Sequence, residues 1–301
     1  MRIGMVGLGR MGANMTVRLL EGGHDVVAFD VRPEVIEEVS ERGATAAASL
    51  SDLVGTLDAP RAVWLMVPAG EVTSRTVAEL SGLLARGDTI VDGGNSNYAD
   101  TLERARTLAE LGINLVDAGT SGGVWGLREG YCLMIGADEE PFARLESVFA
   151  TLAPAGGYAR MGRPGSGHFV KMVHNGIEYA LMQSYGEGFE ILEASDFDLD
   201  LASIAELWRH GSVVRSWLLD LTASALASDP SLEQVSDYVD DSGEGRWTVQ
   251  DAIDRAVPAP AIALALFARF RSRQDQSFSG RLLAALRKEF GGHATRPPDL
   301  R

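Results

Sequence analysis

Short apolar runs alternate with stretches of helical periodicity through the first 160 residues of the chain. The runs RIGMVG, DVVAFD, AVWLMV and DTIVDG have the composition of strands, and helical periodicity begins near residues 11, 33 and 71. INLVDAG and YCLMIG predict two further strands. Strands that alternate with helices are typical of βαβ units with a mostly parallel sheet. We therefore expect an α/β domain of the doubly wound, Rossmann type in this part of the chain.

The strand pattern stops after GRPGSG (162–167), and the remaining residues have the periodicity of helices. Breaks are expected at ASDFDLD, ASDPS, DSGEG and VPAP, where small, polar and proline residues cluster. A length of 301 residues also fits about two domains. We predict a dinucleotide-binding domain over residues 1–163 and an all-helical domain for substrate binding and oligomerisation over residues 164–301, which includes the C-terminal tail.

A polar stripe follows the predicted helix that joins the two domains, GSGHFVKMVHNGIEYALMQSYGEGFEIL. At about 100° per residue, Lys171, Asn175 and Glu178 fall within roughly 60° of one another, with His174 beside them. Two interpretations are open: a catalytic face, or a structural polar network in which Lys171 and Glu178 form an ion pair. Burying a lysine and a glutamate for structure alone usually costs more than it returns, which favours the catalytic interpretation.

The charge balance narrows the class of partner. The formal net charge is −15, and the basic residues are scattered, which argues against a nucleic-acid partner. Only two of the 27 basic residues are lysines, Lys171 and Lys288. Because arginine keeps its proton in proteins and a buried lysine can release it, the lysine at 171 indicates acid–base chemistry. Arg271 and Arg273 are expected on a solvated face.

The chain has no window that approaches 18 consecutive apolar residues, and MRIGMVGLGRMG leads into a strand and a turn without a signal-peptide cleavage region. We therefore expect no membrane partner and a cytoplasmic protein. The single cysteine, Cys132, cannot form an internal disulfide, and the apolar run YCLMIG predicts a packed small residue rather than a nucleophile. Redox and zinc chemistry are not expected, and no metal site is predicted.

The segment Gly7–Gly12, GLGRMG, is a G-x-G-x-x-G placed directly after a strand and at the start of a helix. Such glycines permit a tight turn, the approach of the backbone to a pyrophosphate, and close contact between helix and strand. The second strand ends in Asp30, 18 residues after Gly12, where a carboxylate would bind ribose hydroxyls and repel a 2′-phosphate. NAD is the expected cofactor, but Arg32 is close enough to contact a 2′-phosphate, which leaves NADP open. Asp30 could instead cap the helix at RPEVIEEV.

Four segments carry a resemblance to a known family: GLGRMGANM (7–15), DGGNSNYADT (92–101), SGGVWG (121–126) and GHFVKMVHNGIEY (167–179). Together they resemble the 6-phosphogluconate dehydrogenases, within the β-hydroxyacid dehydrogenase superfamily, and the length is similar to that of a short bacterial branch. GRWT, FAR and RKEFGGH resemble later motifs of this family. The resemblance implies oxidative decarboxylation of 6-phospho-D-gluconate to D-ribulose 5-phosphate and CO2 with reduction of NAD, a step of the pentose phosphate pathway and of gluconate utilization.

Oxidation of a secondary alcohol requires a base, and the enediol left after loss of CO2 requires an acid. Lys171 and Glu178, two turns apart on one helix face, meet this requirement. The resemblance implies that Lys171 takes the proton of the 3-hydroxyl and that Glu178 protonates carbon 1. The expected cofactor-binding residues are Gly7, Leu8, Gly9, Arg10, Met11, Gly12, Asp30, Val67 and Asn95. The expected substrate-binding residues are Asn95, Ser121, Gly122, Gly123, His174, Asn175, Tyr179, Arg269, Arg287 and His293.

The C-terminal tail (residues 286–301), LRKEFGGHATRPPDLR, contains residue types that an unstructured chain end does not require. The Gly291–Gly292 pair predicts a left-handed end to a helix, with His293 on an extended arm, and Pro297-Pro298 prevents the helix from resuming. In the family that the chain resembles, such an arginine and histidine enter the active site of a neighbouring subunit. We therefore expect Arg287 and His293 to act in trans in a homodimer or homotetramer.

Two segments depart from the pattern of the family. Asp30-Val31-Arg32 stands where the members that use NADP have Asn-Arg-Thr, which supports NAD. Ser242-Gly243-Glu244 replaces a Lys-Gly-Thr that contacts the sugar phosphate, so the phosphate must depend more on arginines elsewhere. Two other functions stay open: a β-hydroxyacid dehydrogenase that acts on a small hydroxy acid without loss of CO2, and a non-catalytic NAD-binding sensor.

Overall fold

The chain divides into two units, Met1–Asn175 and a second that begins at Gly176, and each is described by itself. The structure is a computed structural model that describes residues 1–296, so the Pro297-Pro298 pair lies outside the described residues. Helix α8 (Ser166–Glu193) belongs to both units, because its first turns lie in one and its remainder in the other. The domain boundary predicted after residue 163 lies just before this helix and stays a prediction.

The described part of the first unit holds an eight-stranded sheet in the order β3-β2-β1-β4-β5-β6-β7-β8. All its strand pairs are parallel except β6 with β7. The order reverses between β1 and β4, and in such sheets the crevice at the carboxyl ends of the strands binds nucleotides. The expected Rossmann-type domain is confirmed. The strands are β1 (Arg2–Val6), β2 (Asp25–Phe29), β3 (Thr45–Ala46), β4 (Ala62–Leu65), β5 (Thr89–Asp92), β6 (Asn114–Ser121), β7 (Cys132–Gly136) and β8 (Tyr158–Gly162).

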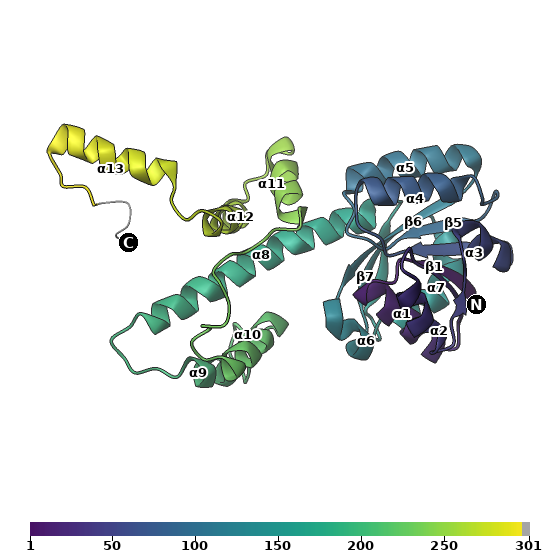
Figure 1. The fold of residues 1–301 in the computed structure, drawn as a ribbon, viewed down its shortest axis with the longest axis horizontal. Coiled ribbons are helices and arrows are strands. Elements are labelled where there is room, and N and C mark those ends of the chain that lie inside the picture. The colour runs from purple at the N-terminus through teal and green to yellow at the C-terminus, as the bar shows by residue number, and fades with distance from the viewer. Residues whose placement is uncertain (297–301) are drawn as a thin grey trace. The chain divides into compact units, whose positions relative to one another are not determined.

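Helices cover both faces of this sheet (Figure 1). Side chains alternate along each strand, so Met5 and Trp64 join a core with α1 and α7, whereas Val63 and Leu65 join a core with α3 and α4. One face carries α1 (Arg10–Glu21), α2 (Pro33–Ser40) and α7 (Glu139–Leu152), and the other carries α3 (Leu50–Thr56), α4 (Glu71–Ser81) and α5 (Tyr98–Leu111). The short helices η1 (Gly123–Trp125) and α6 (Gly126–Glu129) follow β6.

Polar and glycine residues set the ends of these helices. The Ser49 hydroxyl accepts a hydrogen bond from the Asp52 N–H and caps α3, and the Asn97 side chain caps α5 in the same way through the Ala99 N–H. α5 ends at Gly112, whose left-handed conformation (φ 73°) suits glycine.

The second unit is all-helical over its described residues, as the sequence predicts. Phe189 of α8 packs with α9 and α10, and Tyr179 of α8 packs with Ala265 and Leu266 of α12. None of the side chains of α13 is buried, and Gly292 ends that helix in a left-handed turn (φ 63°), which confirms the predicted helix end. The helices after α8 are α9 (Leu201–Trp208), α10 (Trp217–Ser228), α11 (Glu244–Asp254), α12 (Pro260–Ser272) and α13 (Phe278–Gly291).

Cys132 is not a packed core residue, and that prediction is wrong. The side chain is exposed because β7 begins at this position, and only the four residues that follow it in the strand are buried. Within residues 1–296, no helix combines the length and the apolar character needed to cross a membrane.

Candidate functional site

The turn between β1 and α1 has the geometry that GLGRMG predicts. Gly7 has a φ of 91°, which disfavours any other residue type. A Cβ atom on Gly12 would lie 2.0 Å from the carbonyl oxygen of Gly7, so α1 could not approach the turn with a side chain there. A Cβ atom on Gly9 would meet nothing within 4 Å. The turn is thus open at the N-terminus of α1, where backbone N–H groups favour an anion such as a pyrophosphate.

A cavity of about 750 Å³ opens at the carboxyl ends of β1, β2 and β4. This volume lies within the usual range for cofactor sites, and the open glycine turn forms part of its wall, so the residues present fit a dinucleotide. Six predicted cofactor residues line it: Gly7, Gly9, Met11, Asp30, Val67 and Asn95. The other three, Leu8, Arg10 and Gly12, belong to the turn without lining the cavity.

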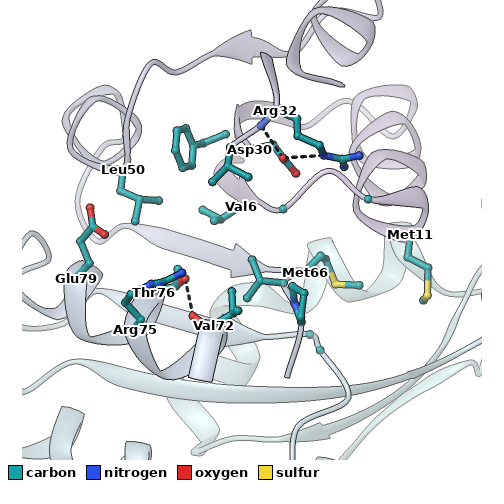
Figure 2. A pocket seen from close by; sticks show the side chains of 18 of the residues that line it. Val6, Met11, Asp30, Arg32, Leu50, Met66, Val72, Arg75, Thr76 and Glu79 are labelled. Atoms are coloured by element: carbon teal, nitrogen blue, oxygen red, sulfur yellow. Dashed lines mark hydrogen bonds and ion pairs between the residues drawn. The ribbon is translucent and has the colours of Figure 1, made fainter. Parts of the chain in front are cut away.

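Helix α4 supplies a wall of the cavity that the sequence pattern does not predict. Arg75, Thr76 and Glu79 line the cavity across from Asp30 and Arg32 (Figure 2). These side chains project from the helix that follows β4, so they meet the cavity only because the sheet order places β4 beside β1. No local motif marks these positions, so a pattern along the chain does not identify them.

Asp30 is held by backbone and side-chain donors at the end of β2. Its Oδ2 accepts a hydrogen bond from the Leu8 N–H at 2.6 Å, and its Oδ1 accepts from the Arg32 N–H at 2.9 Å and from Arg32 Nε at 3.3 Å. Burial raises the pKa of the Asp30 carboxyl, but the hydrogen bonds from Leu8 and Arg32 outweigh it, and the pKa lies below its ordinary value. Arg32, not Asp30, is the N-cap residue of α2, so the capping interpretation of Asp30 is wrong.

The loop after β5 carries Asn95 to the cavity and is fixed by a buried carboxylate. Asp92 accepts hydrogen bonds from the Gly94 N–H at 3.1 Å and from the Ser96 hydroxyl at 2.8 Å. Arg104 of α5 pairs with the same carboxylate at 3.3 Å. The role of Asp92 and Arg104 is not among the sequence predictions, although an aspartate at the carboxyl end of a buried strand is a recognisable signal.

Ser121 and the first turns of α8 come together in the first unit. The Ser121 hydroxyl lies 3.5 Å from His174 Nε2, and His174 Nδ1 lies 3.0 Å from the Asn175 side-chain oxygen. Lys171 is only 6% exposed and Asn175 only 7%. Gly122 and Gly123, which follow Ser121, have φ values of 132° and 52°, so the loop after β6 needs glycine at both positions.

In the second unit, Tyr179 and Arg269 form one cluster with the start of α11. The guanidinium of Arg269 lies 3.5 Å from the centre of the Tyr179 ring, and its Nη1 donates to the Asp240 carbonyl at 2.7 Å. The Tyr179 hydroxyl accepts a hydrogen bond from the Ser242 N–H at 3.1 Å. A Cβ atom on Gly245 would lie 2.4 Å from the Tyr179 ring, so this glycine lets α11 approach the tyrosine.

A carboxylate occupies one of the two segments where the sequence departs from the family that it resembles. Glu244 is 2% exposed, its Oε2 accepts a hydrogen bond from the Ser242 hydroxyl, and its Oε1 is buried without a hydrogen-bond partner among residues 1–296. Helix α11 begins at Glu244, where the N-terminal end of the helix favours a negative charge. Ser242 and Glu244 therefore satisfy part of each other's hydrogen bonding at this end of the helix.

Asp241 pairs with two arginines beside this cluster. Arg246 Nε lies 2.6 Å from Asp241 Oδ2, and Arg273 Nη2 lies 2.6 Å from Asp241 Oδ1. The hydrogen bond from Arg246, aided by that from Arg273, lowers the pKa of the Asp241 carboxyl to about 2. The Arg273 side chain is only 20% exposed, so the prediction that it lies on a solvated face is wrong: the residue is drawn inward by Asp241.

The remaining predicted residues lie on helices of the second unit or directly after them. Glu178 is half-buried on α8, seven residues after Lys171, and this spacing corresponds to about 10.5 Å along the helix axis. Arg287 is exposed on α13, and His293 is exposed just after the end of that helix. Within residues 1–296, no group of three or more His, Cys, Asp or Glu side chains is arranged to hold a metal ion.

Both units match models of a known enzyme family. Residues 2–173 match the NAD binding domain of 6-phosphogluconate dehydrogenase, and residues 167–290 match the C-terminal domain of 6-phosphogluconate dehydrogenase. The chain is 45% identical over 295 residues to the NAD(+)-dependent, decarboxylating 6-phosphogluconate dehydrogenase of Haloferax volcanii, with 97% of this chain and 98% of the relative covered. It is also 45% identical to a Bacillus subtilis protein provisionally named 6-phosphogluconate dehydrogenase YqeC, with 98% and 99% covered.

Solved structures agree with this assignment at the level of the fold. The 6-phosphogluconate dehydrogenase of Plasmodium falciparum has a TM-score of 0.84 at 26% identity, and the match covers 100% of this chain and 67% of that one. The 3-hydroxyisobutyrate dehydrogenase of Mycobacterium tuberculosis has a TM-score of 0.73 at 22% identity, with 95% and 99% covered. The second likeness extends to the fold alone.

Proposed function

Because this chain belongs to the 6-phosphogluconate dehydrogenase family, we propose that it converts 6-phospho-D-gluconate into D-ribulose 5-phosphate and CO2 with reduction of NAD. Its first unit contains the NAD-binding domain of the family. The observation that carries the proposal is the presence of Lys171 and Glu178, a base and an acid, two turns apart on one helix within a chain that matches the family over almost its whole length. The reaction belongs to the pentose phosphate pathway.

Lys171 acts first, as the base. Its amine accepts the proton of the 3-hydroxyl while carbon 3 is oxidised to a ketone. Bound NAD supplies the acceptor for the hydride that leaves carbon 3. The protonated amine then donates a hydrogen bond to the 3-keto oxygen, which favours negative charge on that oxygen as the carboxylate leaves as CO2. The electrons of the broken bond are taken up by this carbonyl, so the reaction requires no metal ion.

Glu178 acts second, as the acid. Loss of CO2, with transfer of the Lys171 proton to the 3-keto oxygen, leaves an enediol; a proton must then be added at the carbon that becomes carbon 1 of ribulose 5-phosphate, while the same oxygen returns its proton to Lys171. Glu178 donates this proton and returns to its acidic form by taking up a proton from water or from the substrate. Glu178 is half-buried on α8.

The other residues of the proposal bind the substrate. His174 and Asn175 hold the carboxylate and hydroxyls, and Asn95, Ser121 and the two glycines that follow Ser121 approach the reacting end. The hydrogen bond between His174 and Asn175 supports this role, because it orients the imidazole with Nε2 3.5 Å from the Ser121 hydroxyl. Tyr179 and Arg269 hold the phosphate, and their stacked contact gives a single orientation to the guanidinium.

We propose that NAD is preferred over NADP. The depressed pKa of Asp30 keeps its carboxylate negative at the end of β2, where a 2′-phosphate would be repelled. Arg32 and Arg75 also line the cavity. Arg32 forms an ion pair with Asp30, which makes its guanidinium less available to bind a phosphate. The charge of Asp30 therefore disfavours a 2′-phosphate.

We also propose an oligomer in which the tail of one subunit completes the site of another. The support comes from α13, whose apolar side chains are exposed in the single chain, among them Leu283 at 62% and Phe290 at 79%. A helix with an unburied apolar face needs a partner surface. Arg287 and His293 would reach the phosphate of the neighbouring site, and a two-fold dimer is the simplest arrangement.

A steady-state assay tests the reaction. The protein is given 6-phosphogluconate with NAD or with NADP, in the presence of EDTA, and NADH or NADPH, CO2 and ribulose 5-phosphate are measured. We expect one CO2 for each reduced nucleotide and a higher kcat/KM with NAD. Nucleotide reduction without CO2 would identify a non-decarboxylating enzyme, and NADH binding without any turnover would identify a sensor.

Complementation tests the tail. Lys171→Ala and His293→Ala variants, each nearly inactive, are unfolded, mixed in equal amounts and refolded together. If the tail acts in trans, each mixed dimer has one doubly damaged site and one intact site, and about a quarter of all sites recover. If activity stays at the level of the parents, the tail acts within its own subunit and the proposed arrangement fails.

A further inference from the structure

Strand β6 and helix α8 meet at three successive positions on one face of the strand, all within the first unit. Asp117, Gly119 and Ser121 share this face because side chains alternate along a strand. Asp117 meets the start of α8, Gly119 meets Lys171, and Ser121 meets His174. Strand and helix therefore run side by side in the same direction. From one of these three strand residues to the next, the contact on α8 moves by about one helical turn.

Asp117 accepts two backbone hydrogen bonds from the start of α8. Its Oδ1 lies 2.6 Å from the Gly165 nitrogen and its Oδ2 lies 2.7 Å from the His168 nitrogen. The Asp117 side chain is fully buried, and the buried His168 ring is held by a 2.8 Å hydrogen bond between its Nδ1 and the Thr101 hydroxyl. The carboxylate thus satisfies N–H groups that an isolated helix start would leave without partners.

Two glycines allow the helix to lie directly on the sheet. A Cβ atom on Gly119 would lie 2.5 Å from the Cβ of Lys171 and 2.8 Å from the Gly167 carbonyl oxygen. A Cβ atom on Gly167 would lie 2.3 Å from the Met134 carbonyl oxygen. Carbon atoms normally approach one another to about 3.5–4.0 Å. A side chain at position 119 would therefore move Lys171 by about 1 Å.

We infer that Asp117 and Gly119 are positioning residues for Lys171: Asp117 anchors the start of α8 to β6, and Gly119 sets the distance at which the lysine stands from the sheet. The inference rests on the proposed role of Lys171 as the base. Neither residue touches the substrate in this assignment. A displacement of about 1 Å in a catalytic group can lower the rate on the order of 100-fold, so the anchor has a direct effect on turnover.

Asp117→Asn tests the anchor, with Asp88→Asn as the matched control. An asparagine offers one acceptor oxygen, so its amide nitrogen would face one of the two N–H donors. Asp88 is also buried and also accepts two backbone N–H groups, from Arg61 at 2.6 Å and Ala85 at 2.9 Å, but it precedes β5, at the other end of that strand from Asn95. We expect kcat to fall at least about tenfold in Asp117→Asn, with the KM for 6-phosphogluconate and the Kd for NADH within about threefold of wild type.

Gly119→Ala tests the distance, with Gly55→Ala as the matched control. A Cβ atom on Gly55, in α3, would meet nothing within 4 Å. We expect kcat to fall on the order of 100-fold in Gly119→Ala and to stay within about twofold of wild type in Gly55→Ala. This pair also decides the inference if Asp117→Asn does not fold.

Hydrogen–deuterium exchange of the amides of residues 165–168 separates this inference from the proposed function. Exchange should be faster in Asp117→Asn than in wild type and unchanged in Asp88→Asn, whether or not 6-phosphogluconate is turned over. An inactive wild type would remove the proposed function, and the exchange result would then decide the anchor alone. A kcat within twofold of wild type in Gly119→Ala, an equal loss of kcat in Asp88→Asn and Asp117→Asn, or unchanged exchange would overturn the inference.

Discussion

Gly9→Ala is the most direct test of where the pyrophosphate of the cofactor lies. Gly9 is the N-cap residue of α1, with φ −60° and ψ 176°, a conformation that alanine adopts without strain. A Cβ atom there would meet no protein atom within 4 Å. The substitution therefore adds one methyl group to the open side of the turn and leaves the packing of the protein unchanged.

The size of the effect follows from the bonds that the methyl group would displace. If the pyrophosphate lies against this turn, the methyl occupies its path and removes at least one hydrogen bond between a backbone N–H and a charged oxygen. Such a bond contributes about 1.5–3 kcal/mol. The Kd for NADH should therefore rise about 10- to 150-fold. The stability of the free protein should stay the same or rise by up to about 1 kcal/mol, because alanine has less freedom than glycine in the unfolded chain.

NADH binding is measured by fluorescence titration, and stability by thermal unfolding without ligand. Gly55→Ala provides a control in which neither quantity should worsen. Gly12→Ala provides the opposite control: its Cβ would lie 2.0 Å from the Gly7 carbonyl oxygen, so both stability and NADH affinity should fall. If Gly9→Ala binds NADH within about twofold of wild type, the pyrophosphate does not approach this turn, and the assignment of the cavity to NAD loses its basis.

Four further results are expected. Lys171→Arg should retain no more than about a few per cent of kcat while it still binds NADH and 6-phosphogluconate, because arginine keeps the charge but cannot exchange its proton; a higher kcat in steady-state assays would contradict the role as base. Glu178→Gln should slow both CO2 release and ribulose 5-phosphate formation, and formation of that product at the wild-type rate would exclude the role as acid. Asp30→Asn combined with Val31→Arg should shift the ratio of kcat/KM for NAD to that for NADP at least about tenfold toward NADP, since it removes a repulsion and adds a partner; an unchanged ratio would count against the role of Asp30. Asp241→Asn should lower the Tm equally at pH 7 and pH 5, because the pKa of Asp241 is depressed from 3.8 to about 2 in the folded state, so its ion pairs stabilise the protein above pH 3.8 and lose that effect as the pH falls toward 2. Calorimetry of wild type and variant over the same pH range measures the difference in Tm. A difference that grows as the pH falls would contradict the depressed pKa of Asp241.

Local patterns located the elements whose side chains are buried. The strands β1, β2, β4 and β5 are continuous apolar runs, and the predicted helix starts near 11, 33 and 71 agree with α1, α2 and α4 to within one residue. In contrast, β3 has two exposed residues and β8 has none that is fully buried, so neither produces an apolar run. Their pairing depends on neighbouring strands, which a local pattern does not describe.

The candidate site was predictable where a motif places a residue type at a fixed spacing. GLGRMG and the polar stripe of α8 are of this kind, because the turn and the helix are set by local sequence. The contribution of Arg75 and the pairing of Arg104 with Asp92 were not predictable in this way. Both depend on which strands are neighbours and on how α4 and α5 pack, and these are contacts between residues far apart in the chain.

Two buried carboxylates show how the fold and the site depend on each other. Asp92 and Asp117 are paired in the register of β5 and β6, so two acidic side chains stand side by side in the interior. Burial raises the pKa of Asp117, and the charge of Asp92 acts in the same direction, whereas His168 and the N–H groups of Gly165 and His168 lower it.

Each carboxylate is compensated by donors that include a segment of the candidate site. Asp92 binds the loop that carries Asn95 together with Arg104, and Asp117 binds the start of the helix that carries Lys171. A buried carboxylate without such partners would cost several kcal/mol, on the order of the total stability of a domain. If the segment that carries Asn95 or Lys171 moved away from the sheet, a buried carboxylate would lose its hydrogen-bond donors. The stability of the sheet therefore holds both residues in place before any ligand binds.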